Sequence, residues 1–341
     1  MDINLFDYYL PEELIAQEPS KVRDECRLLV VNKTNKTYED KIFRDIIDYF
    51  KAGDVLVRNN TKVIPARLFA TKEGTGAKVE VLLLNDQGDD TWECLCGNAK
   101  AIKVGSILHF KDGILIGTCT KVKDEGLRLI KFDYKGIFLE ELDKIGLMPL
   151  PPYIHKQVED NSEYQTVYAK VEGSAAAPTA GFHFTPELLN KLKEKGVEIV
   201  DITLNIGLGT FRPVKVQDTK DHIMHSETYE VSFEAAKTLN KAKEEGRRII
   251  ACGTTSVRTL ESNYSKFNCF KEENSSTSIF ISPGYKYQAV DALITNFHLP
   301  KSTLVMLVSA FMGREFTLEC YKHAVEEKYR FFSFGDSMFI Y

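Results

Sequence analysis

The sequence lacks the features that mark secreted, membrane-bound and disulfide-stabilised proteins. It has seven cysteines, an odd and scattered set that argues against a disulfide framework and suits a reducing compartment. Residues 1–7 show no basic start followed by an apolar stretch, so we expect no secretory signal. The most apolar later run, residues 304–312, is far too short to span a bilayer. We therefore expect a cytoplasmic protein without membrane contact.

The sequence also lacks an excess of positive charge and the glycine patterns of common nucleotide sites. Its 44 Lys and Arg residues face 49 Asp and Glu, a formal net charge of −5, which argues against non-specific coating of nucleic acid but permits a local basic face. Gly207 and Gly209 lack the third glycine and the acidic residue of a dinucleotide site. The segment 253–258 lacks the Gly-Lys-Ser/Thr ending of a P-loop. We therefore expect no nicotinamide cofactor.

The pattern of expected elements divides the chain. Its 341 residues suggest two domains. Short β-rich runs separated by Gly, Asn and Asp fill residues 66–134, which predicts a small antiparallel barrel or sandwich. Strands and helices alternate elsewhere, which favours a mostly parallel sheet. We expect a discontinuous α/β domain, residues 1–65 and 135–341, that carries the active site and is interrupted by an inserted all-β domain, residues 66–134.

Local signals fix several expected elements. Thr185 is a plausible N-cap for a helix that begins at Pro186, and Ser302 can cap a largely apolar helix that runs through Met312. We expect a further helix over residues 316–329 and a final strand over 330–334.

The run 177–184 combines small residues with a histidine. Small residues let a backbone approach a ligand closely, and His183 stands just before the helix N-terminus at Pro186, where free N–H groups attract anionic or electron-rich atoms. A tight turn with a packed histidine explains the same residues equally well, because histidine is both the usual acid–base residue and a common core residue.

The turn after the apolar strand 249–252 is a candidate anion site. Gly253, Thr254 and Thr255 lead into a helix that carries Arg258, so we favour carboxylate or phosphate recognition over simple helix capping. Asn296 alternates with Phe297 and His298 between a strand and the next helix and could flank a planar ligand. A polar loop ahead of a buried helix is the alternative.

Two other segments concentrate polar groups. If extended, His225 and Glu227 share one face, and a polar contact or general base is favoured. A metal site formed with His222 fits no standard spacing, so we expect no metal. Asn60, Lys62 and Arg67 lie where the two expected domains meet, a favoured place for ligand sites.

Taken together and in order, these segments resemble the S-adenosylmethionine:tRNA ribosyltransferase-isomerase family of queuosine biosynthesis. The resemblance covers nearly the whole chain, and its specificity comes from many ordered blocks, each weak by itself. The blocks are residues 10–17, 60–68, 148–154, 164–169, 177–184, 207–214, 253–260, 295–307 and 332–338.

The resemblance implies an α/β domain interrupted by a β-barrel, in agreement with the pattern above. It also implies a reaction that moves the ribosyl part of S-adenosylmethionine onto 7-aminomethyl-7-deazaguanine at the tRNA wobble position. The ribose rearranges to give epoxyqueuosine, and adenine and methionine leave. S-adenosylmethionine is then a substrate, and no separate cofactor is required. The expected partners are this tRNA and S-adenosylmethionine, acting on a monomer.

The resemblance also suggests roles for particular residues. The reaction needs proton transfers, for which His183, His225, Glu227 and His298 are the candidates. Arg258 could pair with the methionine carboxylate, and Lys62 and Arg67 could contact tRNA phosphate or the site. The other expected substrate-binding residues are Asn60, Tyr168, Thr179, Asn205, Thr210, Thr254, Thr255 and Asn296.

The chain departs from the family pattern at two positions. Histidine is usual where Asn205 stands and leucine where Phe182 stands. Asparagine cannot transfer a proton at neutral pH, so we expect residue 205 to orient a ligand by hydrogen bonding. A methyltransferase and a non-catalytic tRNA-binding module are the rival interpretations. The missing glycine-rich fingerprint argues against the first, and the lack of a clearly basic 66–134 segment argues against the second.

Overall fold

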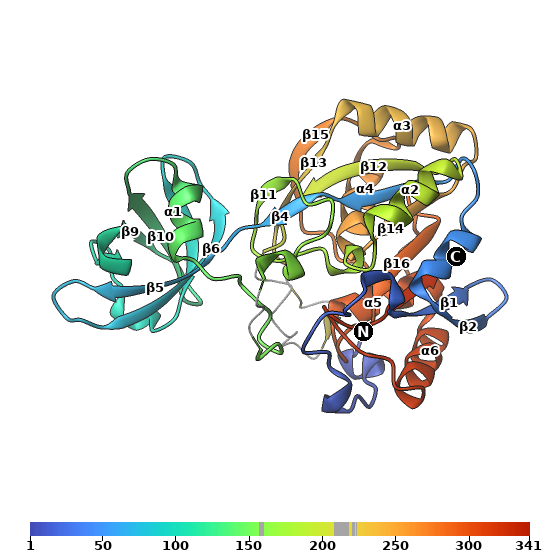
Figure 1. Cartoon of the computed structure of the whole chain (residues 1–341), viewed down its shortest axis with the longest axis horizontal. Helices are drawn as coiled ribbons and strands as arrows, with labels where there is room; N and C mark the ends of the chain where they lie inside the picture. Colours follow the sequence, from blue (N-terminus) through green and yellow to red (C-terminus); the bar gives the residue numbers. More distant parts are fainter. Residues whose placement is uncertain (157–159, 208–217, 220–221, 223) are drawn as a thin grey trace. The chain divides into compact units, whose positions relative to one another are not determined.

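The computed structural model describes the chain except residues 157–159, 208–217, 220–221 and 223 (Figure 1). The chain forms two compact units. The first comprises Met1–Asn60, Pro152–Lys170 and Pro178–Tyr341, and the second comprises Thr61–Pro151 and Val171–Ala177. The second unit extends beyond the expected insertion 66–134, because chain on both sides of that segment packs with it.

A nine-stranded mixed sheet forms the centre of the first unit. Its strands are Arg27–Asn32 (β1), Thr37–Ile42 (β2), Val55–Asn59 (β3), Glu198–Leu204 (β12), Glu227–Val231 (β13), Ile249–Cys252 (β14), Glu273–Thr277 (β15), Ala292–Asn296 (β16) and Ser337–Ile340 (β17). Their order is β15-β13-β12-β3-β14-β16-β17-β1-β2. The central strands β12, β3, β14 and β16 run parallel, as do β17 and β1, and the other neighbours are antiparallel.

Burial explains which strands lie in the middle. All residues of β14 and β16 are buried, as expected for parallel strands that are covered on both faces. The edge strand β2 is polar and largely exposed, which discourages pairing with another chain. On one face, Leu56, Ile250 and Ile294 pack in a single apolar cluster with residues of helix α2 (Pro186–Glu194) and the 3₁₀ helix η4 (Phe43–Tyr49).

The other α-helices of the first unit are Phe233–Glu244 (α3), Thr254–Phe267 (α4), Thr303–Met312 (α5) and Arg314–Glu326 (α6). The expected N-caps are confirmed, because the hydroxyl of Thr185 accepts from Leu188 N at 3.1 Å and that of Ser302 from Val305 N at 3.3 Å. Helix α5 is buried over most of its length, as its apolar sequence predicts.

The second unit is built around a closed antiparallel barrel with the strand order β10-β7-β6-β5-β8-β9. Its strands are Arg67–Lys72 (β5), Lys78–Asp86 (β6), Thr91–Cys96 (β7), Ile107–Phe110 (β8), Leu115–Val122 (β9) and Leu127–Asp133 (β10). Helix α1 (Phe138–Ile145) adds Leu142 to the barrel core. A two-stranded parallel sheet joins Thr61–Val63 (β4) to Val171–Ser174 (β11). The predicted fold class, a mixed sheet domain plus a small antiparallel barrel, is confirmed.

The expected final strand over residues 330–334 is wrong. Strand β17 begins at Ser337, and the preceding residues form a turn around the buried carboxylate of Asp336. This carboxylate accepts from Arg27 N at 2.9 Å and from Arg330 N at 2.7 Å. Phe332 in the turn has a φ of 70°, a left-handed conformation that a strand excludes. The alternation of apolar residues favoured a strand, whereas the long-range hydrogen bonds of Asp336 select a turn.

Candidate active site

The carboxyl ends of four parallel strands meet at one edge of the first unit's sheet. Asn60 follows β3, Asn205 follows β12, Gly253 follows β14, and Asn296 ends β16. Ligands of open α/β sheets bind outside this edge. The expected residues from four separate segments are therefore brought to one edge by the topology.

The run 177–184 packs against the end of β14. A Cβ atom on Gly181 would lie 2.0 Å from Tyr168 Oη, so only glycine fits there. Tyr168 Oη in turn lies 3.8 Å from Cys252 Sγ, at the last residue of β14. A Cβ atom on Gly253 would be 3.5 Å from that of Ala180. The small residues of this run thus allow close approach to the start of α4.

His183 is buried, and both of its ring nitrogens are engaged. Nδ1 lies 3.0 Å from Cys26 Sγ, and Nε2 lies 3.0 Å from Asn296 Oδ1. We assign the Nε2–H tautomer, because the amide oxygen of Asn296 can only accept, and the thiol of Cys26 then donates to Nδ1. Burial lowers the pKa of His183 to about 4, although the hydrogen bond to Asn296 opposes this shift. The imidazole is therefore neutral near neutral pH, and this arrangement suits a residue that positions others.

The backbone of the strained turn fixes the orientation of Asn296. Its Nδ2 donates to the carbonyl oxygen of Phe332 at 2.8 Å and to that of Ser333 at 3.3 Å. Because the amide nitrogen is used there, the oxygen faces His183. Bulky residues with positive φ occur where the surroundings impose them, often at functional sites. Phe332 thus links the turn before β17 to the polar end of β16.

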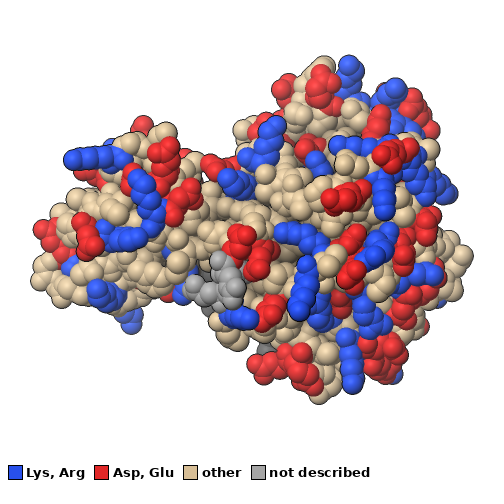
Figure 2. All heavy atoms as spheres, viewed as in Figure 1, with Lys and Arg blue, Asp and Glu red and all other residues tan. Residues whose placement is uncertain are grey.

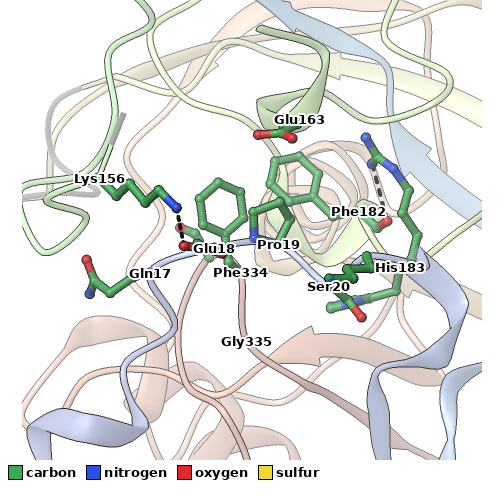
Figure 3. A pocket seen from close by; sticks show the side chains of 13 residues that line it. Gln17, Glu18, Pro19, Ser20, Lys156, Glu163, Phe182, His183, Phe334 and Gly335 are labelled. Carbon is green, nitrogen blue, oxygen red and sulfur yellow. Dashed lines mark hydrogen bonds and ion pairs between the residues drawn. The ribbon is translucent and has the colours of Figure 1, made fainter. Parts of the chain in front are cut away.

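A cavity of ≈ 340 Å³ opens beside His183 (Figure 3). This volume lies within the range of small-molecule sites. Its walls come from four parts of the first unit. The lining residues are Gln17, Glu18, Pro19, Ser20, Lys21, Arg23, Lys156, Glu163, Phe182, His183, Ser333, Phe334 and Gly335.

The cavity wall combines aromatic rings with charged groups. The rings of Phe182 and Phe334 lie nearly parallel, with centroids 6.0 Å apart. Arg23 stabilises this wall, because its guanidinium donates to the carbonyl oxygens of Gln165 at 2.9 Å and Phe182 at 3.3 Å. Figure 3 shows Lys156 paired with Glu18 and the Glu163 carboxylate beside the rings. Such a wall suits a planar ring that carries polar substituents.

Glu227 and Arg258 form a buried ion pair. Glu227 is the first residue of β13, and its Oε2 accepts from Arg258 Nη1, while Oε1 accepts from Gly207 N at 3.3 Å. Both side chains are less than a tenth exposed. Both oxygens of the carboxylate are thus engaged by donors of the protein. The pairing therefore favours a positioning role for Glu227.

The other two candidate histidines lie in different surroundings. His298 is half-buried, its Nε2 lies 2.7 Å from Thr295 Oγ1, and its Nδ1 has no hydrogen bond to the described residues. Burial lowers the pKa of His298 to about 3, so its imidazole is neutral and only weakly basic near neutral pH. His225 is exposed, two residues before β13.

The remaining predicted residues fall into three groups. Asn60 is buried and accepts from Thr203 Oγ1 at 2.7 Å, whereas Thr179, Asn205, Thr254 and Thr255 are half-buried on the elements described above. Lys62 and Arg67 belong to the second unit, where they pair with Glu172 and Glu80 at 2.8 and 2.7 Å. Thr210 lies outside the described residues.

Individual cavity residues were missed by the sequence reasoning. Gln17 and the segment 333–335 lie in blocks that carried the family resemblance, so those blocks were a usable signal. Arg23 and Glu163 of the cavity, and Cys26 beside His183, had no such signal, because their roles depend on partners far away in sequence. Cys26 and His183, for example, are separated by 157 positions.

Three further facts concern the visible surface, the helices and the possible metal ligands. Figure 2 shows Lys and Arg side chains interspersed with Asp and Glu, and this face displays no broad patch of described residues with one sign. Within the part of the chain that the structure describes, no helix is long and apolar enough to cross a membrane. Among the same residues, no three His, Cys, Asp or Glu side chains gather as a metal site would require.

Among the matches to known proteins, a family and a solved structure extend over nearly the whole chain. The family described as queuosine biosynthesis protein matches residues 3–340. A crystal structure of an S-adenosylmethionine tRNA ribosyltransferase from Thermotoga maritima shares 39% sequence identity, with a TM-score of 0.57. The match covers 99% of this chain and 100% of that one. With its mixed sheet, its antiparallel barrel and its ordered sequence blocks, this chain belongs to the queuosine biosynthesis protein family.

Proposed function

We propose that this protein transfers and isomerises the ribosyl moiety of S-adenosylmethionine onto 7-aminomethyl-7-deazaguanine at the tRNA wobble position. The products are epoxyqueuosine in tRNA, adenine and methionine. The observation that carries the proposal is the family match over residues 3–340. The solved relative named S-adenosylmethionine tRNA ribosyltransferase, similar over 99% of the chain, supports the same activity.

The chemistry defines what the site must supply. The sulfonium makes the adjacent C5′ proton more acidic, so a positioned base can remove it. The substrate amine must be neutral before it attacks, and adenine leaves more easily when its ring nitrogen is protonated. The site must therefore exchange protons with both substrates and hold their reacting atoms close together in the correct orientation.

The geometry supports different roles for the histidines. His298 is the better candidate for contact with a substrate, because its Nδ1 is not engaged by described residues, whereas both ring nitrogens of His183 are. His183 acts as a positioning residue that holds Asn296 and forms a wall of the cavity. The rings of Phe182 and Phe334 offer a stacking surface to a substrate base.

The partners follow from the reaction. The substrates are S-adenosylmethionine and the precursor tRNA, and we propose that no further cofactor is needed because the sulfonium supplies the electrophile. We also propose that the protein works as a monomer in the cytoplasm. Lys62 and Arg67 of the second unit are candidates for tRNA phosphate contacts, which would replace their present pairing with Glu172 and Glu80.

The decisive experiment incubates the purified protein with S-adenosylmethionine and a tRNA that carries the deazaguanine precursor. We expect adenine and methionine to be released in step with ribosyl transfer to the tRNA. The matched control is the same tRNA with guanine at the wobble position, which should give no release. Release of S-adenosylhomocysteine would instead identify a methyltransferase and reject the proposal.

A further inference from the structure

One face of helix α4 carries buried polar atoms with no hydrogen-bond partner in the structure described. These atoms are Thr255 Oγ1, Arg258 Nε and Nη2, and Thr259 Oγ1. The three residues are spaced at i, i+3 and i+4, so they lie on the same side of the helix. The Arg258 side chain is only 9% exposed. A charged donor left unpaired in the interior is costly, which makes this cluster a candidate ligand site.

The free atoms of Arg258 form the edge that recognises carboxylates. Glu227 occupies Nη1, so Nε and Nη2 remain together on the other side of the planar guanidinium. These two N–H groups point in parallel and match the two oxygens of a carboxylate in a bidentate pair. Glu227 thus holds the guanidinium in place while it leaves that edge without a hydrogen bond.

The position of Arg258 directs this edge toward the carboxyl ends of the strands. Arg258 is the fifth residue of α4, and helical side chains lean toward the helix N-terminus. Its partner Glu227 also binds Gly207 N, just beyond the end of β12. The N-terminus of α4 begins after Gly253 without a side-chain cap and without an acidic residue in its first turn. Its free N–H groups and its dipole add a further attraction for an anion.

Charge balance selects the kind of anion. The Glu227–Arg258 pair is already neutral, so a dianionic phosphate would leave two uncompensated negative charges in a buried place. A monoanionic carboxylate leaves one uncompensated negative charge, and an ammonium group on the same molecule would offset that charge. An α-amino acid has both groups.

We propose that Arg258 binds the amino-acid carboxylate of S-adenosylmethionine through Nε and Nη2, assisted by the Thr255 hydroxyl and the N-terminus of α4. Glu227 is a positioning residue that orients Arg258. This assignment rests on the proposed function, because that function supplies the ligand. Since Nε and Nη2 are buried, the carboxylate displaces protein atoms to reach them.

The test compares S-adenosylmethionine with its decarboxylated analogue, measured by titration calorimetry on the full chain. The wild type should bind S-adenosylmethionine about 10- to 100-fold more tightly, as expected for a bidentate charge-assisted pair. Arg258→Lys keeps the positive charge but loses the two parallel N–H groups. It should reduce the preference for S-adenosylmethionine over the decarboxylated analogue at least about tenfold relative to wild type. Arg247→Lys is the matched control, because Arg247 pairs with Glu198 and Glu245 before β14, and it should leave the preference unchanged.

Glu227→Gln separates positioning from catalysis. If Glu227 orients Arg258, the variant raises KM for S-adenosylmethionine and weakens the preference for the carboxylate. A fall in kcat with the preference intact would overturn the positioning role. Equal binding of the two ligands by the wild-type protein would overturn the carboxylate site, and this comparison needs no variant. That result would leave tRNA-dependent adenine release untouched, so it is distinguishable from failure of the proposed function.

Discussion

The buried state of His183 predicts a specific pH dependence of stability. In the unfolded chain His183 takes up a proton near its ordinary pKa of 6.5, whereas burial lowers the pKa in the folded protein to about 4. Between these values the unfolded state binds more protons, so the free energy of unfolding falls as the pH falls. His183 contributes a slope of up to about 1.4 kcal/mol per pH unit and a total loss of about 3 kcal/mol. His298, with its pKa lowered to about 3, acts in the same direction.

The variant His183→Gln isolates this contribution. Glutamine does not titrate, and its amide can still donate to Asn296 Oδ1. We expect the variant to lose up to about 1.4 kcal/mol per pH unit of the slope, whatever its stability at neutral pH. The assay is urea unfolding followed by far-UV circular dichroism at several pH values between about 4.5 and 7. His155→Gln is the matched control, because His155 is exposed, and it should keep the wild-type slope.

A His183→Gln variant whose unfolding free energy depends on pH as steeply as that of the wild type would contradict the lowered pKa of His183. Such a result would mean that His183 is protonated in the folded protein near neutral pH. Its tautomer, its hydrogen bond from Cys26 and its positioning role would then all have to be reassigned.

Three further predictions concern other parts of the first unit. Gly181→Ala should destabilise the protein by about 1–3 kcal/mol, because its Cβ would lie 2.0 Å from Tyr168 Oη, and an unchanged urea midpoint would contradict this close approach. Glu261→Gln should lower the free energy of unfolding, measured in urea, by roughly 3 kcal/mol. The buried carboxylate accepts at Oε1 from Ala289 N at 2.9 Å and from Val290 N at 3.1 Å, and at Oε2 from Tyr285 Oη at 2.9 Å. The amide of glutamine has only one oxygen, so it cannot accept on both sides. Phe334→Leu should raise KM for one of the two substrates about tenfold in the adenine-release assay, since leucine fills the wall but does not stack, and two unchanged KM values would remove Phe334 from the site.

The sequence was sufficient for the features that depend on local chemistry. The N-caps at Thr185 and Ser302 follow from a hydroxyl placed before an apolar helix, and both were predicted. The apolar runs of β14 and β16 and the even spacing of short barrel strands reflect burial and chain geometry, so they were readable as well.

What the sequence could not reveal depends on pairs that are distant along the chain. Asp336 organises a turn by accepting from Arg27 N, 309 positions away, and this interaction overrides the strand-like pattern of residues 330–334. The same limit applies to His183, which was predicted as one of four acid–base candidates, whereas its partners Cys26 and Asn296 engage both ring nitrogens. Nothing in the sequence indicated that Glu227 forms an ion pair with Arg258, because neither propensity nor periodicity encodes a contact between a strand and a distant helix.

The pairing of β1 with β17 has a consequence for the order in which the chain can fold during synthesis. All six barrel strands lie between Arg67 and Asp133, so the barrel can close while the rest of the chain is still being made. Strand β1, by contrast, must wait for Ser337–Ile340, which is synthesised after all the other strands of this sheet. Strand β1 pairs with β2 on one edge, but its other edge has no strand to pair with until β17 is made, and contacts between such distant segments form slowly. A nascent chain stalled before β17 should therefore display a folded barrel beside an incomplete sheet, a state in which chaperones would find their binding sites on β1.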